Sequence, residues 1–115
     1  MGRINQSFPH WFADSFKKYA DKEETLPVDQ HQLLACIAPR LIYVASSSED
    51  KWADPEGEFL ALKMAAPAWG EGLFDIPKAG EVVEKGKVYY HLREGKHNIT
   101  SWDWERYIAA AKKHL

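Results

Sequence analysis

Two short apolar segments constrain the fold of this chain more than any other feature of its sequence. Residues 41–45 and residues 88–92 are rich in apolar and aromatic side chains and do not alternate regularly with polar ones. Strands of this kind are covered on both faces, which is typical of a parallel sheet packed between helices. Because two parallel strands make a poor sheet alone, we expect further polypeptide to supply their neighbours.

Helical patterns surround the two predicted strands. The predicted helices cover residues 9–19, 29–38, 55–67 and 102–115. Asp29 and Asp54 suit the N-cap position, where a side-chain oxygen accepts a hydrogen bond from the first backbone N–H groups. Residues 69–87 contain four of the seven glycines and are predicted to form a long loop. Strands alternating with helices in this way predict the α/β class.

Length, charge and histidine spacing exclude several classes of function. At 115 residues the chain is one domain or part of one, and its formal net charge of −2 argues against a nucleic-acid or anionic-membrane partner. We expect no membrane span, because no apolar run approaches the required length. We also expect no metal site, because no pair of histidines has metal-ligand spacing with an acid. The single Cys36 excludes an internal disulfide, and its apolar helical surroundings predict a buried structural thiol.

Polar residues follow both predicted strands at the ends where α/β sheets gather their ligands. Asp50, with Glu49 as a neighbouring competitor, follows the first strand, and His97 follows the second. A histidine can serve as a general base, and a carboxylate can accept its ring N–H and fix its tautomer. An acid and then a histidine after the last two strands is the order found in α/β-hydrolases. Trp52, two residues beyond the acid, is placed to line a substrate pocket.

Each of these three residues also has a simpler interpretation. His97 is consistent with a surface-loop histidine, Asp50 with an Asx-turn residue, and Trp52 with a hydrophobic anchor for its loop. The third member of a triad is not found, because no serine lies in a G-x-S-x-G elbow. We therefore predict that residues 1–115 form the C-terminal portion of an α/β-hydrolase sheet, incomplete by itself, and that the nucleophile belongs to an absent N-terminal part.

Four stretches of the sequence resemble the C-terminal part of the glucuronoyl methylesterases, carbohydrate esterase family 15. They are RINQSFPHWF, LPVDQHQLLACIAPRLIYVAS, EDKWADPEGEFL and GKHNITSWDWERY, and the likeness is greater to the bacterial branch than to the fungal one. The resemblance implies a serine esterase that needs no metal or cofactor. Its implied substrate is the ester between 4-O-methyl-glucuronic acid of glucuronoxylan and a lignin alcohol, and its implied location is periplasmic or secreted.

The resemblance also assigns roles to individual residues. His97 matches the catalytic histidine, Asp50 the acid after the penultimate strand, and Trp52 an indole that contacts the uronic acid. Many members carry a catalytic glutamate earlier in the fold, so Asp50 is the main acid, a helper or redundant.

Two kinds of partner are expected besides the uronic acid ester substrate. The exposed sheet edge predicts pairing either with the missing N-terminal segment or with another copy of the chain. The alternative to an esterase is an inactive truncated relative that acts as a carbohydrate-binding or interaction module.

Overall fold

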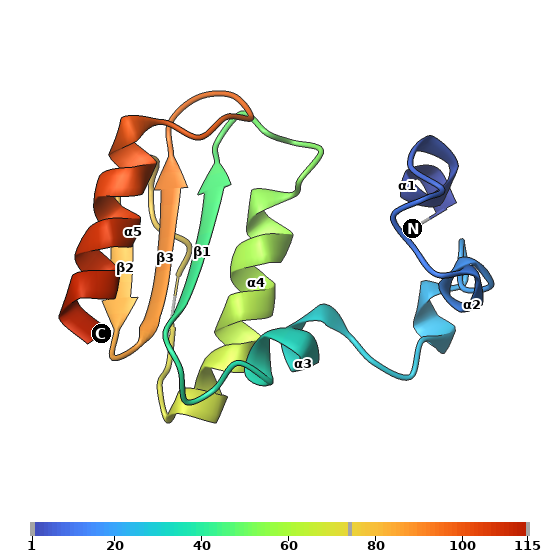
Figure 1. The fold of residues 1–115 in the computed structure, drawn as a ribbon, viewed down its shortest axis with the longest axis horizontal. Helices are drawn as coiled ribbons and strands as arrows, with labels where there is room; N and C mark the ends of the chain where they lie inside the picture. The colour runs from blue at the N-terminus through green and yellow to red at the C-terminus, as the bar shows by residue number, and fades with distance from the viewer. Residues whose placement is uncertain (1, 74, 115) are drawn as a thin grey trace.

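The central feature of the fold is a three-stranded sheet, seen in a computed structural model that describes residues 2–73 and 75–114 (Figure 1). The strand order is β1 (Ile42–Ser47), β3 (Val88–Arg93) and β2 (Val82–Lys85). β1 pairs with β3 in parallel and β2 pairs with β3 antiparallel. The parallel pair predicted from the sequence is therefore confirmed, and so is the α/β class.

The helical elements lie before, between and after the strands. They are α1 (Gly2–Ser7), α2 (Asp14–Lys17), the 3-10 turn η1 (Glu23–Thr25), α3 (Gln30–Ala35), α4 (Pro55–Ala65), the 3-10 turn η2 (Ala66–Trp69) and α5 (Ser101–His114). Three of the four predicted helices have counterparts close to their expected positions, in α3, α4 and α5.

Helices α4 and α5 cover opposite faces of the sheet. Successive side chains of a strand point to opposite faces. Tyr90 therefore packs against Phe59 of α4, with 5.0 Å between ring centroids, whereas the adjacent His91 stacks on Tyr107 of α5 at 5.7 Å. The resulting helix–sheet–helix layers explain why the two parallel strands lack the alternation of a half-exposed strand.

The buried hydrophobic core lies between α4 and the sheet. Its fully buried members include Leu62 of α4 and Val88 and Tyr90 of β3. Burial of side chains of this size contributes roughly 1.5–3 kcal/mol each. This core holds the strand order in place and so positions the loops that follow the strands.

The segment from 69 to 87 differs from its prediction as a long loop. It contains β2, which joins β3 through a tight turn at Gly86, where φ is +55°. Glu84 of β2 also forms an ion pair with Lys113 near the end of α5. The strand was not predicted because it is an edge strand with mostly exposed side chains. Burial therefore imposes no clear alternation of apolar and polar residues on its sequence.

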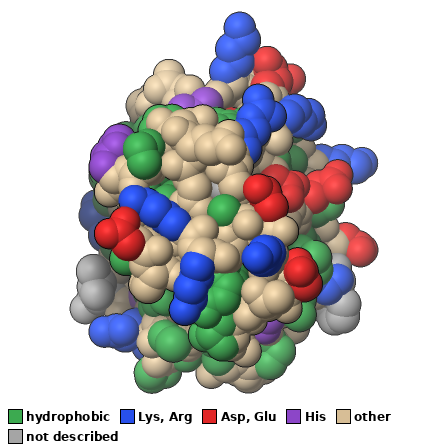
Figure 2. All heavy atoms as spheres, turned by 90° about the vertical axis from the view of Figure 1, so that its right-hand side faces the viewer, with side chains coloured by type: hydrophobic (Ala, Val, Ile, Leu, Met, Phe, Trp, Pro, Cys, Tyr) green, Lys and Arg blue, Asp and Glu red, His purple; other side chains and the backbone are tan. Residues whose placement is uncertain are grey.

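The first part of the chain forms an N-terminal arm, defined here as residues 2–25, that projects away from the sheet (Figure 1). The predicted helix over residues 9–19 is wrong in extent, because only Asp14–Lys17 is helical. Aromatic side chains of this arm stack on one another instead of on a common core, as Phe12 and Phe16 do at 5.0 Å. Figure 2 views the molecule from the right-hand side of Figure 1, and on this face charged side chains of both signs are scattered among apolar ones.

Cys36 is exposed, so the prediction of a buried thiol is wrong. It lies at the C-cap of α3, and its Sγ donates to the carbonyl oxygen of Gln32 at 3.3 Å. The apolar neighbours that suggested burial do not all face the interior, since Leu33 is 64% exposed. The capping box at the start of α3, formed by Asp29 and Gln32, is confirmed.

Helix α4 begins directly after Asp54, the residue predicted to cap it. Asp54 has left-handed backbone angles, with φ 58° and ψ 72°, and its side chain accepts a hydrogen bond from the Gly57 N–H at 3.1 Å. Pro55 occupies the first turn of the helix, where its missing N–H is not needed. A Cβ at Gly57 would lie 2.4 Å from Asp54 Oδ2, so a glycine is required there for the cap to close.

Replacing Asp54 separates the contribution of the cap from that of the backbone conformation. We expect Asp54→Ala to lower the free energy of unfolding by about 1–2 kcal/mol, since it removes the cap and places alanine at positive φ. Asp54→Gly also removes the cap but tolerates positive φ, so it should cost only about a few tenths of a kcal/mol. Urea unfolding followed by circular dichroism measures both, and equal losses would contradict this assignment.

Candidate active site

The parallel register brings together the two loops that carry the candidate residues. Ser47 at the end of β1 lies opposite Arg93 at the end of β3. The pairing continues past the strands, because the Ser48 N–H donates to the Arg93 carbonyl at 2.9 Å and the Glu49 N–H donates to the Gly95 carbonyl at 3.0 Å. The chain segments that follow β1 and β3 therefore stay side by side at the carboxyl end of the sheet.

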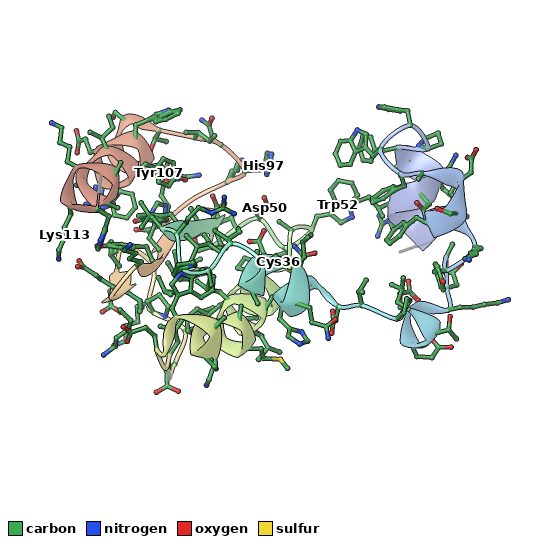
Figure 3. The ribbon with its side chains drawn as sticks, turned by 60° about the horizontal axis from the view of Figure 1, so that its bottom comes forward. Cys36, Asp50, Trp52, His97, Tyr107 and Lys113 are labelled. Carbon is green, nitrogen blue, oxygen red and sulfur yellow. The ribbon has the colours of Figure 1, made fainter. Side chains whose placement is uncertain are left out.

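Asp50 and His97 meet at this end of the sheet (Figure 3). His97 Nδ1 lies 2.5 Å from Asp50 Oδ2. The Asp50 side chain is 14% exposed, whereas that of His97 is 89% exposed. An ionised carboxylate only accepts hydrogen bonds, so Nδ1 carries the proton and Nε2 is left as an acceptor on an accessible ring. That arrangement can take a proton from a hydroxyl group brought to Nε2.

The structure also distinguishes Asp50 from its neighbour in the sequence. The Asp50 N–H donates to the Ser47 carbonyl at 3.1 Å, and the Ala53 N–H donates to the Asp50 carbonyl at 3.2 Å. This tight turn directs the Asp50 carboxylate toward His97, while Glu49 is exposed. Of the two acids considered from the sequence, the one facing the histidine is Asp50.

A second carboxylate near the pair was missed in the sequence. Glu58 of α4 accepts a hydrogen bond from the buried Ser46 hydroxyl at 2.5 Å. Burial raises the pKa of the Glu58 carboxyl, and the negative charges of Asp50 and Asp54 add to that effect. No local sequence pattern distinguishes Glu58 from any other polar residue of an amphipathic helix.

The three consecutive serines at the end of β1 and directly after it have structural partners. Ser46 donates to Glu58, Ser47 Oγ accepts from Arg93 at 2.6 Å, and Ser48 Oγ accepts from the Gly95 N–H at 3.2 Å. Within residues 2–73 and 75–114, none of the serine hydrogen bonds reaches His97. The location of the nucleophile in other polypeptide therefore stays a prediction.

Trp52 extends from the same loop as Asp50 but points toward the N-terminal arm (Figure 3). Its indole is 60% exposed and lies 5.9 Å from the ring of Phe8, which in turn stacks on Trp11 at 4.2 Å. The structure thus places Trp52 on the candidate-site loop and next to a group of aromatic rings. It does not join Trp52 directly to the Asp50–His97 pair.

A buried histidine with no role predicted from the sequence lies on β3, ahead of the loop that carries His97. His91 is fully buried, its Nε2 lies 2.9 Å from Asp103 Oδ1, and its Nδ1 lies 2.9 Å from the Tyr43 hydroxyl. Burial lowers the pKa of His91, and the hydrogen bond to Asp103 only partly offsets this effect. His91 is therefore neutral at pH 7, with Nε2–H donating to Asp103 and Nδ1 accepting from Tyr43.

Asp103 stays ionised although it is buried. Burial alone would raise the pKa of its carboxyl, but hydrogen bonds from the Thr100 backbone N–H at 2.6 Å and hydroxyl at 2.8 Å lower it overall. The hydrogen bond from His91 and the charge of Arg93 act in the same direction. Since Thr100 directly precedes α5, these bonds also cap the start of that helix.

The described part of the chain offers neither a metal cluster nor a membrane-spanning helix. Among its His, Cys, Asp and Glu side chains, no group of three or more is arranged to hold a metal ion. None of the helices described is both long enough and apolar enough to cross a bilayer.

Two parallel strands with an acid and a histidine at their carboxyl ends, covered by helices on both faces, define part of an α/β-hydrolase. Residues 3–71 match a protein family described as "Glucuronyl esterase, fungi". This match covers more than half of the 115 residues, and the chain belongs to the glucuronyl esterase family. The resemblance stated from the sequence is confirmed.

Individual relatives support the same assignment. The chain is 49% identical to a "Carbohydrate esterase MZ0003" from an unknown prokaryotic organism, over 98% of this chain and 27% of that protein. It is 37% identical to a 4-O-methyl-glucuronoyl methylesterase of Hypocrea jecorina, over 51% of this chain and 13% of that protein. The identity is thus higher with the prokaryotic relative than with the fungal one.

Solved structures extend the similarity to the fold. A glucuronoyl esterase from Solibacter usitatus superposes with a TM-score of 0.91 at 44% identity, over 99% of this chain and 30% of that one. A promiscuous CE15 esterase from a marine bacterial metagenome superposes with a TM-score of 0.89 at 49% identity, over 98% of this chain and 30% of that one. The chain therefore spans about 30% of the length of these solved relatives.

The buried His91 predicts how stability responds to acid. Its pKa in the folded chain lies below the ordinary value of 6.5, so the unfolded chain takes up the proton first as the pH falls. The stabilisation is complete above about pH 6.5 and is lost below it, with a slope of at most about 1.4 kcal/mol per pH unit for one proton. We expect His91→Gln, which cannot titrate, to show a smaller decrease in unfolding free energy between pH 7 and 5 than the wild type.

Urea unfolding at several pH values measures this difference. His91→Gln should also be less stable at pH 7 by about 1–3 kcal/mol, because Asp103 and Tyr43 lose well-placed partners. Contributions from other groups, including the raised pKa of Glu58, cancel when the two slopes are subtracted. Identical slopes for wild type and variant would show that His91 is not buried in its neutral form.

Proposed function

We propose that this chain supplies the histidine and an acid of a serine esterase that hydrolyses glucuronoyl esters. The observation that carries the proposal is the Asp50–His97 contact of 2.5 Å at the carboxyl ends of two parallel strands. Membership of the glucuronyl esterase family gives this pair an ester as its substrate class. In this proposal, polypeptide outside residues 1–115 supplies the serine and the oxyanion-stabilising groups.

His97 is the proton carrier in the proposed reaction. Its Nε2 takes the proton of the serine hydroxyl as the serine oxygen attacks the ester carbonyl. The resulting imidazolium then gives that proton to the departing alcohol, leaving the uronic acid bound to serine as an ester. In the second half, Nε2 takes a proton from water, the hydroxide oxygen attacks the acyl group, and the proton returns to the serine oxygen as the acid leaves.

Asp50 stabilises the charged form of His97 in this scheme. Its carboxylate accepts the Nδ1–H bond, which keeps the proton off Nε2 before attack and stabilises the imidazolium afterward. The Asp50 carboxylate is only 14% exposed and its bond faces the ring, while solvent around the 89% exposed His97 side chain screens the charge interaction. We therefore assign Asp50 a working role as the acid rather than a redundant one.

The proposed substrate is a 4-O-methyl-glucuronic acid ester on glucuronoxylan. The name of the Hypocrea jecorina relative describes activity on a 4-O-methyl-glucuronoyl ester. The exposed indole of Trp52 lies on the loop that carries Asp50 and offers an apolar face to a sugar ring. Because xylan is an extracellular polymer, the proposed location is the periplasm or the cell exterior.

A chimera tests the proposed roles directly. In this chimera, residues 1–115 replace the matching 30% of the Solibacter usitatus esterase, and hydrolysis of a benzyl glucuronate ester is measured. We expect activity, a loss of kcat of about 10⁴-fold or more for His97→Ala, and a loss of roughly 10²–10⁴-fold for Asp50→Asn. Glu49→Gln is the matched control and should leave kcat within about threefold, since Glu49 does not face His97.

The two variants test the roles of His97 and Asp50 separately. Full activity of the His97→Ala chimera would overturn the role of His97. Full activity of Asp50→Asn together with an inactive His97→Ala would show that another acid serves the histidine.

The 115-residue chain alone is expected to have no esterase activity. The serines at the end of β1 and directly after it are hydrogen-bonded to Glu58, Arg93 and Gly95, so none of these three is presented to His97. The measurement is hydrolysis of the same benzyl ester by the purified chain, with the chimera as positive control. Robust turnover that depends on His97 would mean that a nucleophile lies within these residues.

A carbohydrate-binding role is the second candidate, favoured by the exposed indoles of Trp52 and Trp11 at 60% and 58%. It predicts that xylo-oligosaccharides bind the chain, that Trp52→Ala abolishes binding and that His97→Ala leaves it unchanged. Calorimetry measures all three. An absence of binding would remove this candidate.

A further inference from the structure

We infer that Arg93 is a positioning residue for the candidate base, holding the backbone on both sides of His97 so that its ring meets Asp50. The inference deepens the proposed function and rests on it for its catalytic meaning. Arg93 lies at the end of β3, and its hydrogen bonds reach neither Asp50 nor the His97 ring.

The guanidinium of Arg93 binds the loop that carries His97 at three carbonyl groups. Nη2 donates to the carbonyl oxygens of Lys96 and Asn98, each at 2.8 Å, and Nη1 donates to that of Glu94 at 3.0 Å. Lys96 and Asn98 flank His97 directly in the sequence. One side chain therefore fixes the peptide groups before and after the histidine.

The same guanidinium ties this loop to the rest of the fold. Nη2 also lies 2.6 Å from Ser47 Oγ on β1, so its two N–H groups are shared among three acceptors, and this contact links it to the strand that leads to Asp50. Nε lies 3.1 Å from Asp103 Oδ2 on α5, close enough for an ion pair but not directed as a hydrogen bond. With side chains 11% and 4% exposed, Arg93 and Asp103 form a largely buried pair, and a buried cation needs such a counter-charge.

The loop is shaped to fit around the guanidinium. Gly95 has φ +112°, which side-chain-bearing residues rarely adopt. A Cβ at this position would lie 3.2 Å from Arg93 Nη1, which is closer than an ordinary contact. Gly95 also pairs with the loop after β1, since its N–H donates to Ser48 Oγ and its carbonyl accepts from the Glu49 N–H. Both the backbone and the space therefore favour glycine beside Arg93.

Packing around the ring itself cannot fix His97. The side chain is 89% exposed, so few neighbours restrict its rotation, and an ion pair with such exposure contributes only about 0–1 kcal/mol. The ring can therefore meet Asp50 only if its backbone places the Cα and Cβ atoms within reach of that carboxylate, and the Arg93 contacts fix this placement. Lysine cannot replace this clamp, because a single ammonium lacks the planar fork that reaches several carbonyl groups at once.

Nitrogen-15 NMR of the His97 ring in the 115-residue chain tests the inference without requiring esterase activity. The bond to Asp50 selects the tautomer with the proton on Nδ1, and imidazole nitrogen shifts report which tautomer is present. We expect Arg93→Lys to lose this selection, as Asp50→Asn does. The matched control Arg106→Lys should retain it, because Arg106 donates to the Trp102 carbonyl on α5 and not to the His97 loop.

His91 serves as the folding reference within each sample. It is fully buried and bound to Asp103, which Arg93 also contacts, so small shifts are expected and retention of the Nε2–H tautomer of His91 shows that the core of a variant is intact. If Arg93→Lys loses the His91 signals, Gly95→Ala replaces it, because the added methyl crowds Nη1. With the His91 tautomer retained, the expected result for either variant is loss of the Nδ1–H tautomer at His97.

Activity of the chimera supplies the second readout. We expect Arg93→Lys to lower kcat by about 10–100-fold through misplacement of the base, with KM changed less than about threefold, and Arg106→Lys to leave both nearly unchanged. Retention of the Nδ1–H tautomer and of kcat in both Arg93→Lys and Gly95→Ala would overturn the inference. A tautomer that depends on Arg93 in a chain whose chimera is inactive would support the positioning role and contradict the proposed function.

Discussion

The in-register parallel pairing of β1 with β3 is the constraint on which the rest of the structure depends. It sets Ser47 opposite Arg93, so that Asp50, three residues later, and His97, four residues later, leave the sheet side by side. Parallel strands deliver their carboxyl ends to one edge, and the hydrogen bonds that continue past the strands prevent the two loops from separating. A slip of one residue would turn every side chain of one strand to the other face and remove this match.

The two faces of the sheet differ in the kind of side chain that they bury. The face toward α4 carries the apolar core, where Tyr90 packs on Phe59. The face toward α5 carries a buried polar network, in which His91 and Arg93 both meet Asp103. The hydrogen bonds that Asp103 accepts from His91 and Thr100 hold this network in one arrangement, whereas Arg93 Nε is held beside Asp103 by charge alone. In this chain the arrangement includes the backbone of the loop that presents His97.

Residues that follow a local pattern could be predicted, and residues that depend on distant partners could not. The paired strands, the caps at Asp29 and Asp54, and the facing of Asp50 and His97 follow from apolar runs and the polar residues after them. Glu58 and the contacts of Arg93 depend on elements far away in the sequence. Cys36 was misjudged because apolar neighbours do not reveal which side of a short helix faces the core. The catalytic roles of Asp50, His97 and Trp52 remain proposals.

The most direct test of the central claim is a crystal structure of the chain, in which the distance between Asp50 Oδ2 and His97 Nδ1 is measured. The account predicts a hydrogen bond, near the 2.5 Å seen here and no longer than about 3.2 Å. It also predicts that Arg93 contacts the carbonyl groups of Lys96 and Asn98 in the same crystal. An Asp50 carboxylate turned away from His97, with the strands β1 and β3 still paired in register, would contradict the claim that the register assembles the site.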